Sequence, residues 1–224
     1  MEIGTEPQLF VDDYVVDNRW PIRFGKEAFV HQVHTPEKDA RNPLIPGQGG
    51  YVHVVRDEEA GLFRMVYQDF WLQQPKPNLK YTYGIAYAES RDGLDWTLPK
   101  IGRYEFKGTK ENNIVWMGPH GARAASPCLL HLPERFRRGH RFVMLYKTGD
   151  GMRLIGSNDC IHWDETSDTL IAKGFHPDTN NSIVYDPRRG LFTWYHRATN
   201  IYGDRMPRED GGASRRIARM AART

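Results

Sequence analysis

Cysteine is scarce in this sequence, and residue spacings that hold metal ions are missing. The 224 residues include two cysteines, Cys128 and Cys160, and neither stands in a metal-type spacing. The nine histidines show no His-x-x-x-His or similar pattern. We therefore expect two reduced, buried thiols, no metal and no cofactor.

Long apolar runs and helical periodicity are also missing. No run approaches about 18 apolar residues, which excludes a transmembrane helix and predicts no membrane partner. Residues 1–6 lack the basic and apolar regions of a signal peptide, so we expect a cytoplasmic protein, or a secreted or periplasmic one whose leader was removed. No stretch repeats apolar residues at the helical period of about 3.6.

Aromatic and turn-forming residues are plentiful. Aromatic side chains make up 12% of the chain, and 21 glycines and 14 prolines indicate many turns. The net charge of +3 comes entirely from Pro207–Thr224, where five arginines stand against two acids. A basic segment of this kind is typical of a solvated end, and without interleaved aromatic residues we expect no nucleic-acid partner. The composition predicts an all-β fold.

One phrase occurs twice. Ser90-Arg91-Asp92-Gly93-Leu94-Asp95-Trp96 and Ser157-Asn158-Asp159-Cys160-Ile161-His162-Trp163 both read Ser-x-Asp-x-x-x-Trp. Serine and aspartate side chains accept bonds from backbone N–H groups two residues on, and glycine supplies a positive φ. The phrase predicts a tight turn between two strands, with the Trp buried at the start of the second.

A second repeated signal lies upstream. Three polar turns lead into apolar strands, at residues 57–67, 137–146 and 186–195. With the Ser-x-Asp turns they define a unit of four antiparallel strands. The expected division is one domain over residues 1–224, with N-terminal strands in 1–41, a first unit in 42–111, a second in 112–174 and an incomplete third in 175–224.

These phrases resemble the five-bladed β-propellers of glycoside hydrolase families 43 and 32. Leu9-Phe10-Val11-Asp12-Asp13-Tyr14, the first Ser-x-Asp phrase and Asp178-Thr179-Asn180-Asn181 carry the resemblance. It implies a partial β-propeller of four-stranded antiparallel blades, about two and a half of five. It also implies a carbohydrate ligand and hydrolysis of a glycosidic bond by paired carboxylates at one end of the central channel.

The resemblance directs attention to residues at the starts of innermost strands and in the loops beside them. The candidate catalytic carboxylates are Asp178, Asp13 and Asp12, and the candidate substrate-binding residues are Arg197, His120, Arg123, Asn180 and Trp71. Each also has a structural reading: turn or cap for Asp178, ion pair for Arg197, loop anchor for Trp71.

Three alternatives stay open. The chain is a glycoside hydrolase-like enzyme, a non-catalytic propeller that binds carbohydrate or protein, or an inactive truncated product. The families' Asn-Asp-Pro-Asn-Gly, Arg-Asp-Pro and Glu-Cys motifs do not occur, so enzymatic activity itself is an open question. An incomplete propeller leaves strand edges open, through which the chain would self-associate.

Overall fold

The computed structural model of the chain describes residues 34–47, 49–71, 82–106, 108–121, 123–175, 177, 180–197, 205–207, 213–215 and 217–223. The chain divides into two compact units, Met1–Asn42 and Pro43–Thr224. In the first unit, Asp39 accepts hydrogen bonds from the backbone and side chain of Arg41. The strand expected around residues 9–16 lies outside the described residues. All the described strands lie in the second unit.

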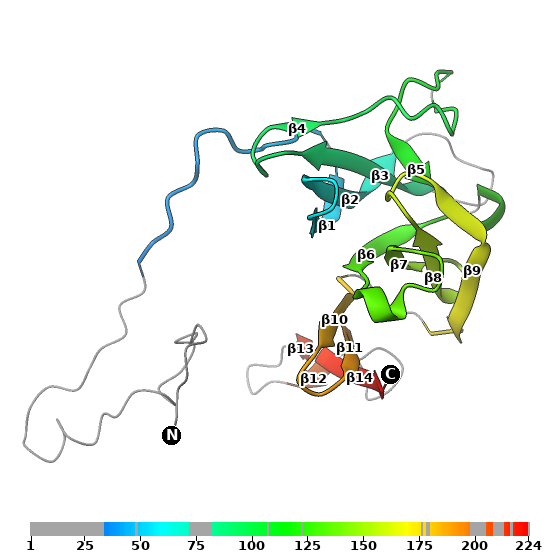
Figure 1. Cartoon of the computed structure of the whole chain (residues 1–224). Coiled ribbons are helices and arrows are strands. Elements are labelled where there is room, and N and C mark those ends of the chain that lie inside the picture. Colours follow the sequence, from blue (N-terminus) through cyan, green and yellow to red (C-terminus); the bar gives the residue numbers. More distant parts are fainter. Residues whose placement is uncertain are drawn as a thin grey trace, which may run out of the picture. The chain divides into compact units, whose positions relative to one another are not determined.

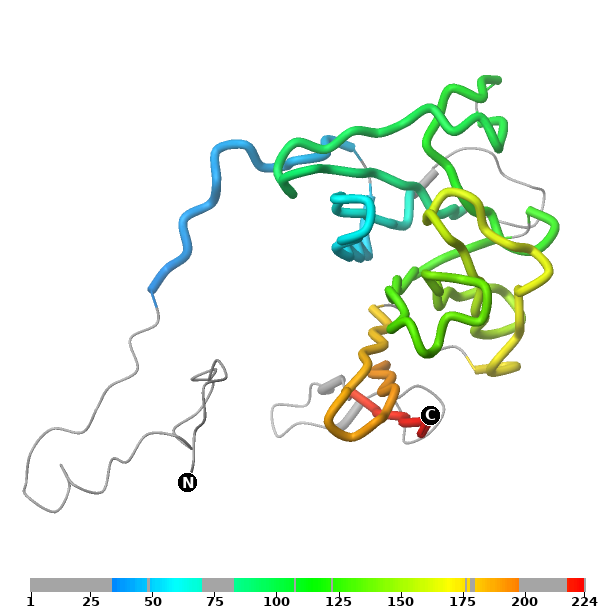
Figure 2. Tube along the Cα trace, in the orientation of Figure 1, coloured from blue at the N-terminus to red at the C-terminus, as the bar shows by residue number. Residues whose placement is uncertain are grey.

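The second unit is built from antiparallel sheets, as Figures 1 and 2 show. The first sheet has the order β1-β2-β3-β4, with β5 also paired to β3, and the second has the order β6-β7-β8-β9. The third has the order β10-β11-β14, and β12 and β13 form a small fourth sheet. The strand bounds are Gly49–Asp57 (β1), Leu62–Trp71 (β2), Thr82–Ser90 (β3), Trp96–Thr97 (β4), Ile114–Trp116 (β5), Ala125–His131 (β6), Phe142–Lys147 (β7), Gly151–Ser157 (β8), Trp163–Lys173 (β9), Ser182–Asp186 (β10), Leu191–Arg197 (β11), Arg205–Pro207 (β12), Ala213–Arg215 (β13) and Ile217–Arg223 (β14).

The described residues contain no α-helix, only the short 3-10 turns Pro119–Gly121 and Glu134–Phe136. None of these turns has the length and apolar character needed to cross a membrane. The all-β prediction is confirmed.

Both Ser-x-Asp phrases form the predicted turn. Ser90 pairs with Trp96 at the start of β4, and Ser157 pairs with Trp163 at the start of β9. In each turn the serine Oγ accepts the backbone N–H three residues on, from Gly93 at 2.9 Å and Cys160 at 3.0 Å. These third residues both have a positive φ, 79° for Gly93 and 62° for Cys160. Cysteine is strained there, but its side chain is fully buried.

The two tryptophans differ in burial. Trp163 is 3% exposed because it belongs to the core cluster between the first and second sheets. Trp96 is only half-buried, because it packs on the other face of the first sheet, beside Ile45 and Met65. The prediction that both rings are largely buried is therefore wrong for Trp96.

The sequence predicts that residues 112–116 begin the second four-stranded repeat, but in the structure they belong to the first sheet. β5 pairs with β3, and the backbone N–H of Tyr87 donates to the Asn113 carbonyl at 2.9 Å. All three residues of β5 are buried. This burial explains the correction: β5 fills the space between two sheets rather than opening the second one, whose first strand is β6.

Two core clusters hold the three large sheets together. The first joins side chains of sheets one and two, including Val66, Ile85 and Tyr87 with Phe142, Met144 and Cys160. The second joins sheets two and three through Cys128, Leu145 and Met152 with Trp194 and Ile183. Both cysteines are free and buried, as predicted. Burial raises the pKa of Cys160 well above its ordinary value and that of Cys128 to about 11.

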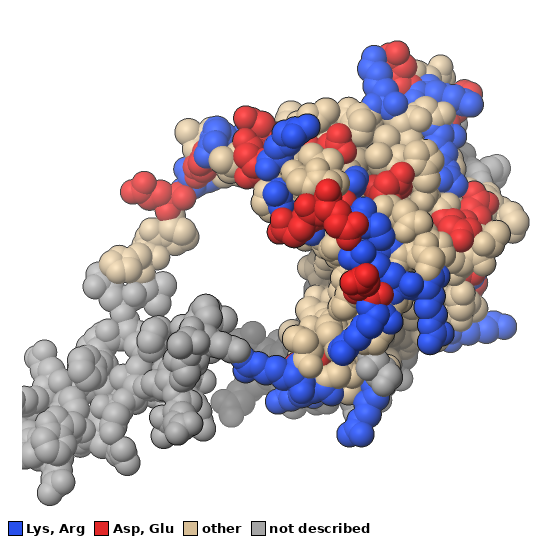
Figure 3. All heavy atoms as spheres, viewed as in Figure 1, with Lys and Arg blue, Asp and Glu red and all other residues tan. Residues whose placement is uncertain are grey.

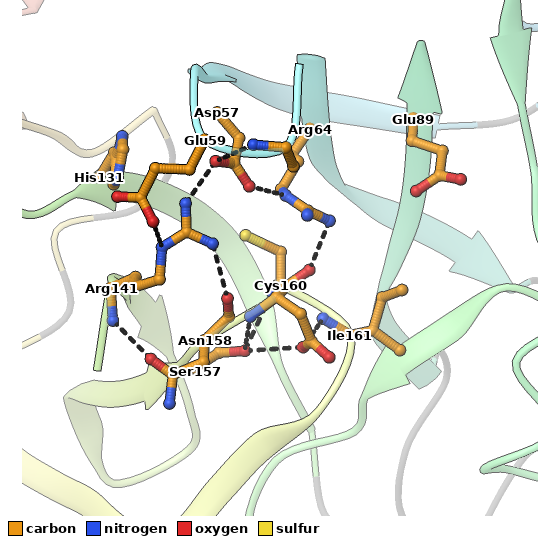
Figure 4. A network of polar contacts seen from close by, with 12 residues as sticks. Asp57, Glu59, Arg64, Glu89, His131, Arg141, Ser157, Asn158, Cys160 and Ile161 are labelled. Atoms are coloured by element: carbon orange, nitrogen blue, oxygen red, sulfur yellow. Dashed lines mark hydrogen bonds and ion pairs between the residues drawn. The ribbon is translucent and has the colours of Figure 1, made fainter. Parts of the chain in front are cut away.

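A buried ionic network crosses from the first sheet to the second (Figure 4). The Asp57 carboxylate, which has no exposed side-chain area, accepts Arg64 Nε at 2.7 Å and also pairs with the Arg141 guanidinium. Arg64 Nη1 donates onward to Tyr87 Oη at 2.8 Å and to the Asp159 carbonyl at 2.9 Å. The turn after β1 is thereby fixed to both the start of β7 and the second Ser-x-Asp turn.

We expect Asp57→Asn to lower the free energy of unfolding by about 3–5 kcal/mol near pH 7, because the buried Arg64 loses its counter-charge and the partly buried Arg141 keeps only Glu59. Burial by itself raises the pKa of Asp57, but the hydrogen bonds from Arg64 and Arg141 outweigh it and hold the pKa below the ordinary value. The carboxylate's contribution is therefore complete above the unfolded-state pKa of about 4 and is lost as the pH falls through the lower folded-state pKa. Urea unfolding at several pH values measures this. A difference between wild type and variant that stays constant from neutral pH to acid would contradict it.

Candidate functional site

The first strands of the three large sheets, β1, β6 and β10, come together near their amino-terminal ends. β6 lies beside both β1 and β10. The Ser126 backbone N–H in β6 donates to Gln68 Oε1 in β2 at 2.7 Å, and the Ile183 N–H in β10 donates to Cys128 Sγ in β6 at 3.1 Å. The Asn181 backbone lies close enough to the His53 ring in β1 to favour the protonated form of that ring. All three large sheets are thus linked at this end.

Each first strand has a residue in the left-handed region at its start. Tyr51, Ser126 and Asn180 have φ values of 53°, 51° and 56°. Tyr51 precedes Asp57 by the same number of residues as Asn180 precedes Asp186, so these positions correspond. Non-glycine residues adopt this conformation at a cost, and such strained residues cluster at binding and active sites.

In β1 and β6 the left-handed residue lies inside a β-bulge. Gly50 pairs with Gln68 while His53 pairs with Val66, so one extra residue stands in β1. Ala125 pairs with Lys147 while Cys128 pairs with Leu145, which places one extra residue in β6. A bulge redirects the side chains around it and is common beside active sites. The two sheets therefore share the same irregularity at the same place.

The second strands bring polar side chains to this level. The second strand of each large sheet has a phenylalanine at or next to its start: Phe63, Phe142 or Phe192. Five residues after these phenylalanines stand Gln68, Lys147 and Arg197. An amide, an ammonium group and a guanidinium group therefore occupy equivalent positions. We call the set His53, Gln68, Ser126, Lys147, Asn181 and Arg197 the first-strand junction.

Two buried polar atoms of this region have no hydrogen-bond partner among the described residues: Ser126 Oγ and His196 Nε2. Ser126 is 1% exposed and His196 is 2% exposed. His196 Nδ1 lies 2.8 Å from the Arg197 carbonyl oxygen, which only accepts, so Nδ1 carries the hydrogen. The second ring nitrogen of His196, Nε2, is left without a partner among the described residues. Burial lowers the pKa of His53 below its ordinary value, against the opposing effect of the Asn181 backbone, so the neutral ring of His53 is favoured.

Some of the predicted site residues lie outside the described residues, and others lie at the first-strand junction or in the segment before β6. Asp178, Asp12 and Asp13 lie outside the described residues, as does the side chain of Trp71, the last residue of β2. Arg197 ends β11 at the first-strand junction, and Asn180 is exposed and directly precedes Asn181, just before β10.

His120 and Arg123 stand in the segment before β6. His120 is exposed and has a φ of 54°, and the Arg123 guanidinium lies over the Tyr83 ring, 4.6 Å from its centroid. No group of three His, Cys, Asp or Glu side chains in the described part of the chain is arranged to hold a metal ion.

Sequence reasoning missed five of the six residues of the junction: His53, Gln68, Ser126, Lys147 and Asn181. Gln68 and Lys147 could have been identified from the sequence, because they align with Arg197 once the three Phe-containing segments are aligned. The positions of Ser126 and His53 in the site depend on the bulges in β6 and β1, and no residue type in the sequence predicts these bulges.

A separate hollow of about 340 Å³ lies on the face of the first sheet that carries Trp96. Val52, Met65, Tyr67, Asp69 and Leu98 are among its lining residues. Asn113 Nδ2 donates to the Tyr67 hydroxyl at 2.8 Å at one side of this hollow. The hollow is on the opposite face of the first sheet from the second sheet.

The strain in the bulge of β6 predicts a stabilising substitution. Ser126→Gly removes both the left-handed strain and a buried hydroxyl without a partner, which outweighs the added flexibility of glycine in the unfolded chain. We expect a gain of about 1 kcal/mol in the free energy of unfolding. Ser157→Gly is the matched control, because its Oγ binds three backbone groups of the second Ser-x-Asp turn, and it should destabilise the protein. Thermal unfolding distinguishes the two; destabilisation by Ser126→Gly would show that the bulge is unstrained.

No protein-family model matches the chain, and no curated protein matches it. Among solved structures it is similar to an N-acetylgalactosamine deacetylase from F. plautii in complex with blood group B trisaccharide (15% identity, TM-score 0.46, 70% of this chain and 48% of that one). It is also similar to a structure described with the GH130 family of mannoside phosphorylases, which contains glycoside hydrolases that target beta-1,2 mannosidic linkages in Candida mannan (17%, 0.41, 75% and 47%). A third similar structure is a glycosyl hydrolase from Bacteroides ovatus (16%, 0.40, 82% and 51%). The chain spans about half the length of these three structures.

Proposed function

We propose that the chain forms blades of a carbohydrate-active β-propeller and that the first-strand junction is its ligand-binding end. The observation that carries this proposal is the left-handed residue repeated at the starts of β1, β6 and β10, three strands whose ends are linked to one another. In a propeller the first strand of every blade lines the same central axis. Equivalent irregularities in equivalent strands would therefore surround one site.

The side chains of the junction suit a ligand rich in hydroxyl groups. Lys147 and Arg197 supply charged donors, and Gln68 and Asn181 bring amide groups. The buried His196 Nε2 and the Ser126 hydroxyl have no partner among the described residues. Buried polar groups of this kind are normally satisfied, so a bound ligand or water would complete them. A sugar offers both donors and acceptors at close spacing, which matches this mixture.

For hydrolysis the site needs two carboxyl groups. We propose Asp178, two residues before Asn180, as one of them. One would protonate the leaving oxygen while the other acts as base or nucleophile, at a separation of about 5–9.5 Å. Arg197 and Asn180 would hold substrate hydroxyls, with His120, Arg123 and Trp71 as outer contacts. The finer assignment, to a relative of families 43 and 32, rests on the sequence phrases alone.

The test combines calorimetric binding with turnover over a panel of oligosaccharides and aryl glycosides. Arg197→Gln should weaken binding of any sugar ligand about 10- to 100-fold, because a charge-assisted hydrogen bond is worth about 1.5–3 kcal/mol. Asp178→Asn should lower kcat about 10²- to 10⁴-fold while changing affinity little, since it removes only proton transfer or attack.

The matched control is Arg189→Gln, an exposed arginine in the turn between β10 and β11, which should change neither quantity. Binding without turnover in the wild type would leave a carbohydrate-binding propeller and remove the role of Asp178. Absence of binding to every carbohydrate tested would overturn the proposed function.

A further inference from the structure

The second sheet is covered on both faces, whereas the first and third each have one face that no described sheet covers. In β7 the side chains of Met144 and Tyr146 belong to the cluster shared with the first sheet. Leu145, which lies between them in the chain, belongs to the cluster shared with the third sheet. The faces left over are the Met65 face of the first sheet and the Tyr195 face of the third.

Exposed apolar side chains gather on these two faces. On the first sheet Val54 pairs with Met65, and Val54 and Leu98 are each 44% exposed. On the third sheet Val184 and Ser182 pair with Thr193 and Tyr195, and Val184 and Tyr195 are 45% and 42% exposed. Ile217, opposite Arg197, is 81% exposed. Exposed apolar side chains gathered on one face are typical of interaction surfaces.

The two faces are complementary in position. When β2, β7 and β11 are aligned on the phenylalanine near the start of each, Val66, Leu145 and Tyr195 occupy the same position. Met65, Met144 and Trp194 occupy the position before it. Val66 helps cover the Met144 face of the second sheet, and Leu145 helps cover the Trp194 face of the third. Each sheet therefore presents its Val66-type face to the Met65-type face of the next. The third sheet has a Val66-type face that no described sheet covers, and the first sheet has a Met65-type face that Ile45 and Trp96 cover only in part, leaving Val54 and Leu98 exposed.

Charge and shape favour the same pairing. The Tyr195 face carries the exposed side chains of Arg219 and Arg223, which pair with Tyr195 and Leu191. Figure 3 shows Lys and Arg side chains over this sheet and a mixture of acidic and basic side chains over the first sheet. The Met65 face contains the hollow with Asp69 in its wall, large enough for an aromatic side chain such as Tyr195. Two Tyr195 faces would bring arginines together, so the third sheet is disfavoured as its own partner.

We propose that two copies of this chain close head to tail, the Tyr195 face of each covering the Met65 face of the other. This arrangement makes two identical interfaces related by a twofold axis and a closed ring of six large sheets. A head-to-tail contact gives a ring when the rotation closes and a filament when it does not. The proposal places self-association on sheet faces, not on the strand edges that the sequence suggested.

Sedimentation equilibrium of the full chain tests this, with Val54→Glu, Tyr195→Glu and Ile171→Glu as variants. The three wild-type side chains have similar exposure, but Ile171 stands in β9, away from both faces. The wild type and Ile171→Glu should sediment at twice the mass of one chain. Either face variant should raise the dimer dissociation constant roughly 30-fold or more, as for a central interface residue. Near-ultraviolet circular dichroism confirms that each variant is folded.

Mixing the two face variants separates this arrangement from others. A Val54→Glu copy and a Tyr195→Glu copy retain one intact interface between them, so the mixture should form a heterodimer more tightly than either variant forms a dimer alone. A wild-type monomer, a series of larger species, or a face variant that dimerises as the wild type does would each overturn the proposal. So would a mixture that behaves like its separate components.

Discussion

The contact of Asp57 with Arg64 and Arg141 is the constraint on which the arrangement of the first two sheets depends. A carboxylate with no exposed area is tolerable only because two guanidinium groups and the backbone N–H of Ala60 surround it. The same Arg64 also reaches the Asp159 carbonyl, so the turn after β1 and the second Ser-x-Asp turn are fixed together. Apolar packing supplies most of the attraction between the sheets, but this network sets which residues face each other. Its opposite end is the first-strand junction, where Gln68 and Ser126 join the same two sheets.

The backbone strain at the first-strand junction persists because the opposite end of the interface between the first two sheets is held in place by the ionic network. Tyr51 and Ser126 keep unfavourable φ angles because the remainder of each strand is held in register by its neighbours. A bulge in an isolated hairpin would relax by slipping one residue, which would turn every following side chain to the wrong face. Here such a slip would turn Val55 and Leu129 away from the core cluster that they join and break the ionic network at Asp57. The fold thus stores local strain where polar side chains converge.

Much of the architecture could be predicted from the sequence, for a definite physical reason. The Ser-x-Asp turns are local: their hydrogen bonds join residues two or three apart, so the residue types determine them. The strand order follows from those turns and from the Gly-containing hairpins. The position of β5 could not be predicted in this way, because its three apolar residues suit either neighbouring sheet and only packing decides. The half-exposure of Trp96 likewise depends on what covers a sheet face, not on its own turn.

The site was harder to predict than the fold. Arg197 was identified from its place at the end of a strand, and the three-strand alignment would have added Gln68 and Lys147. His53 and Ser126 take their roles from bulges, where one extra residue alters direction without altering composition. His196 was hidden for another reason: a histidine within an apolar strand gives no sign of which nitrogen is satisfied until the backbone around it is known.

The two cysteines divide the molecule's interfaces between them. Cys160 lies in the cluster between the first and second sheets, and Cys128 lies in the cluster between the second and third. Both thiols are buried and have raised pKa values, so a thiol reagent modifies either one only when its own interface opens. The chain therefore carries two natural reporters of opening, one for each pair of neighbouring sheets. Their labelling rates would show whether the three sheets separate together or one after another, with no engineered probe.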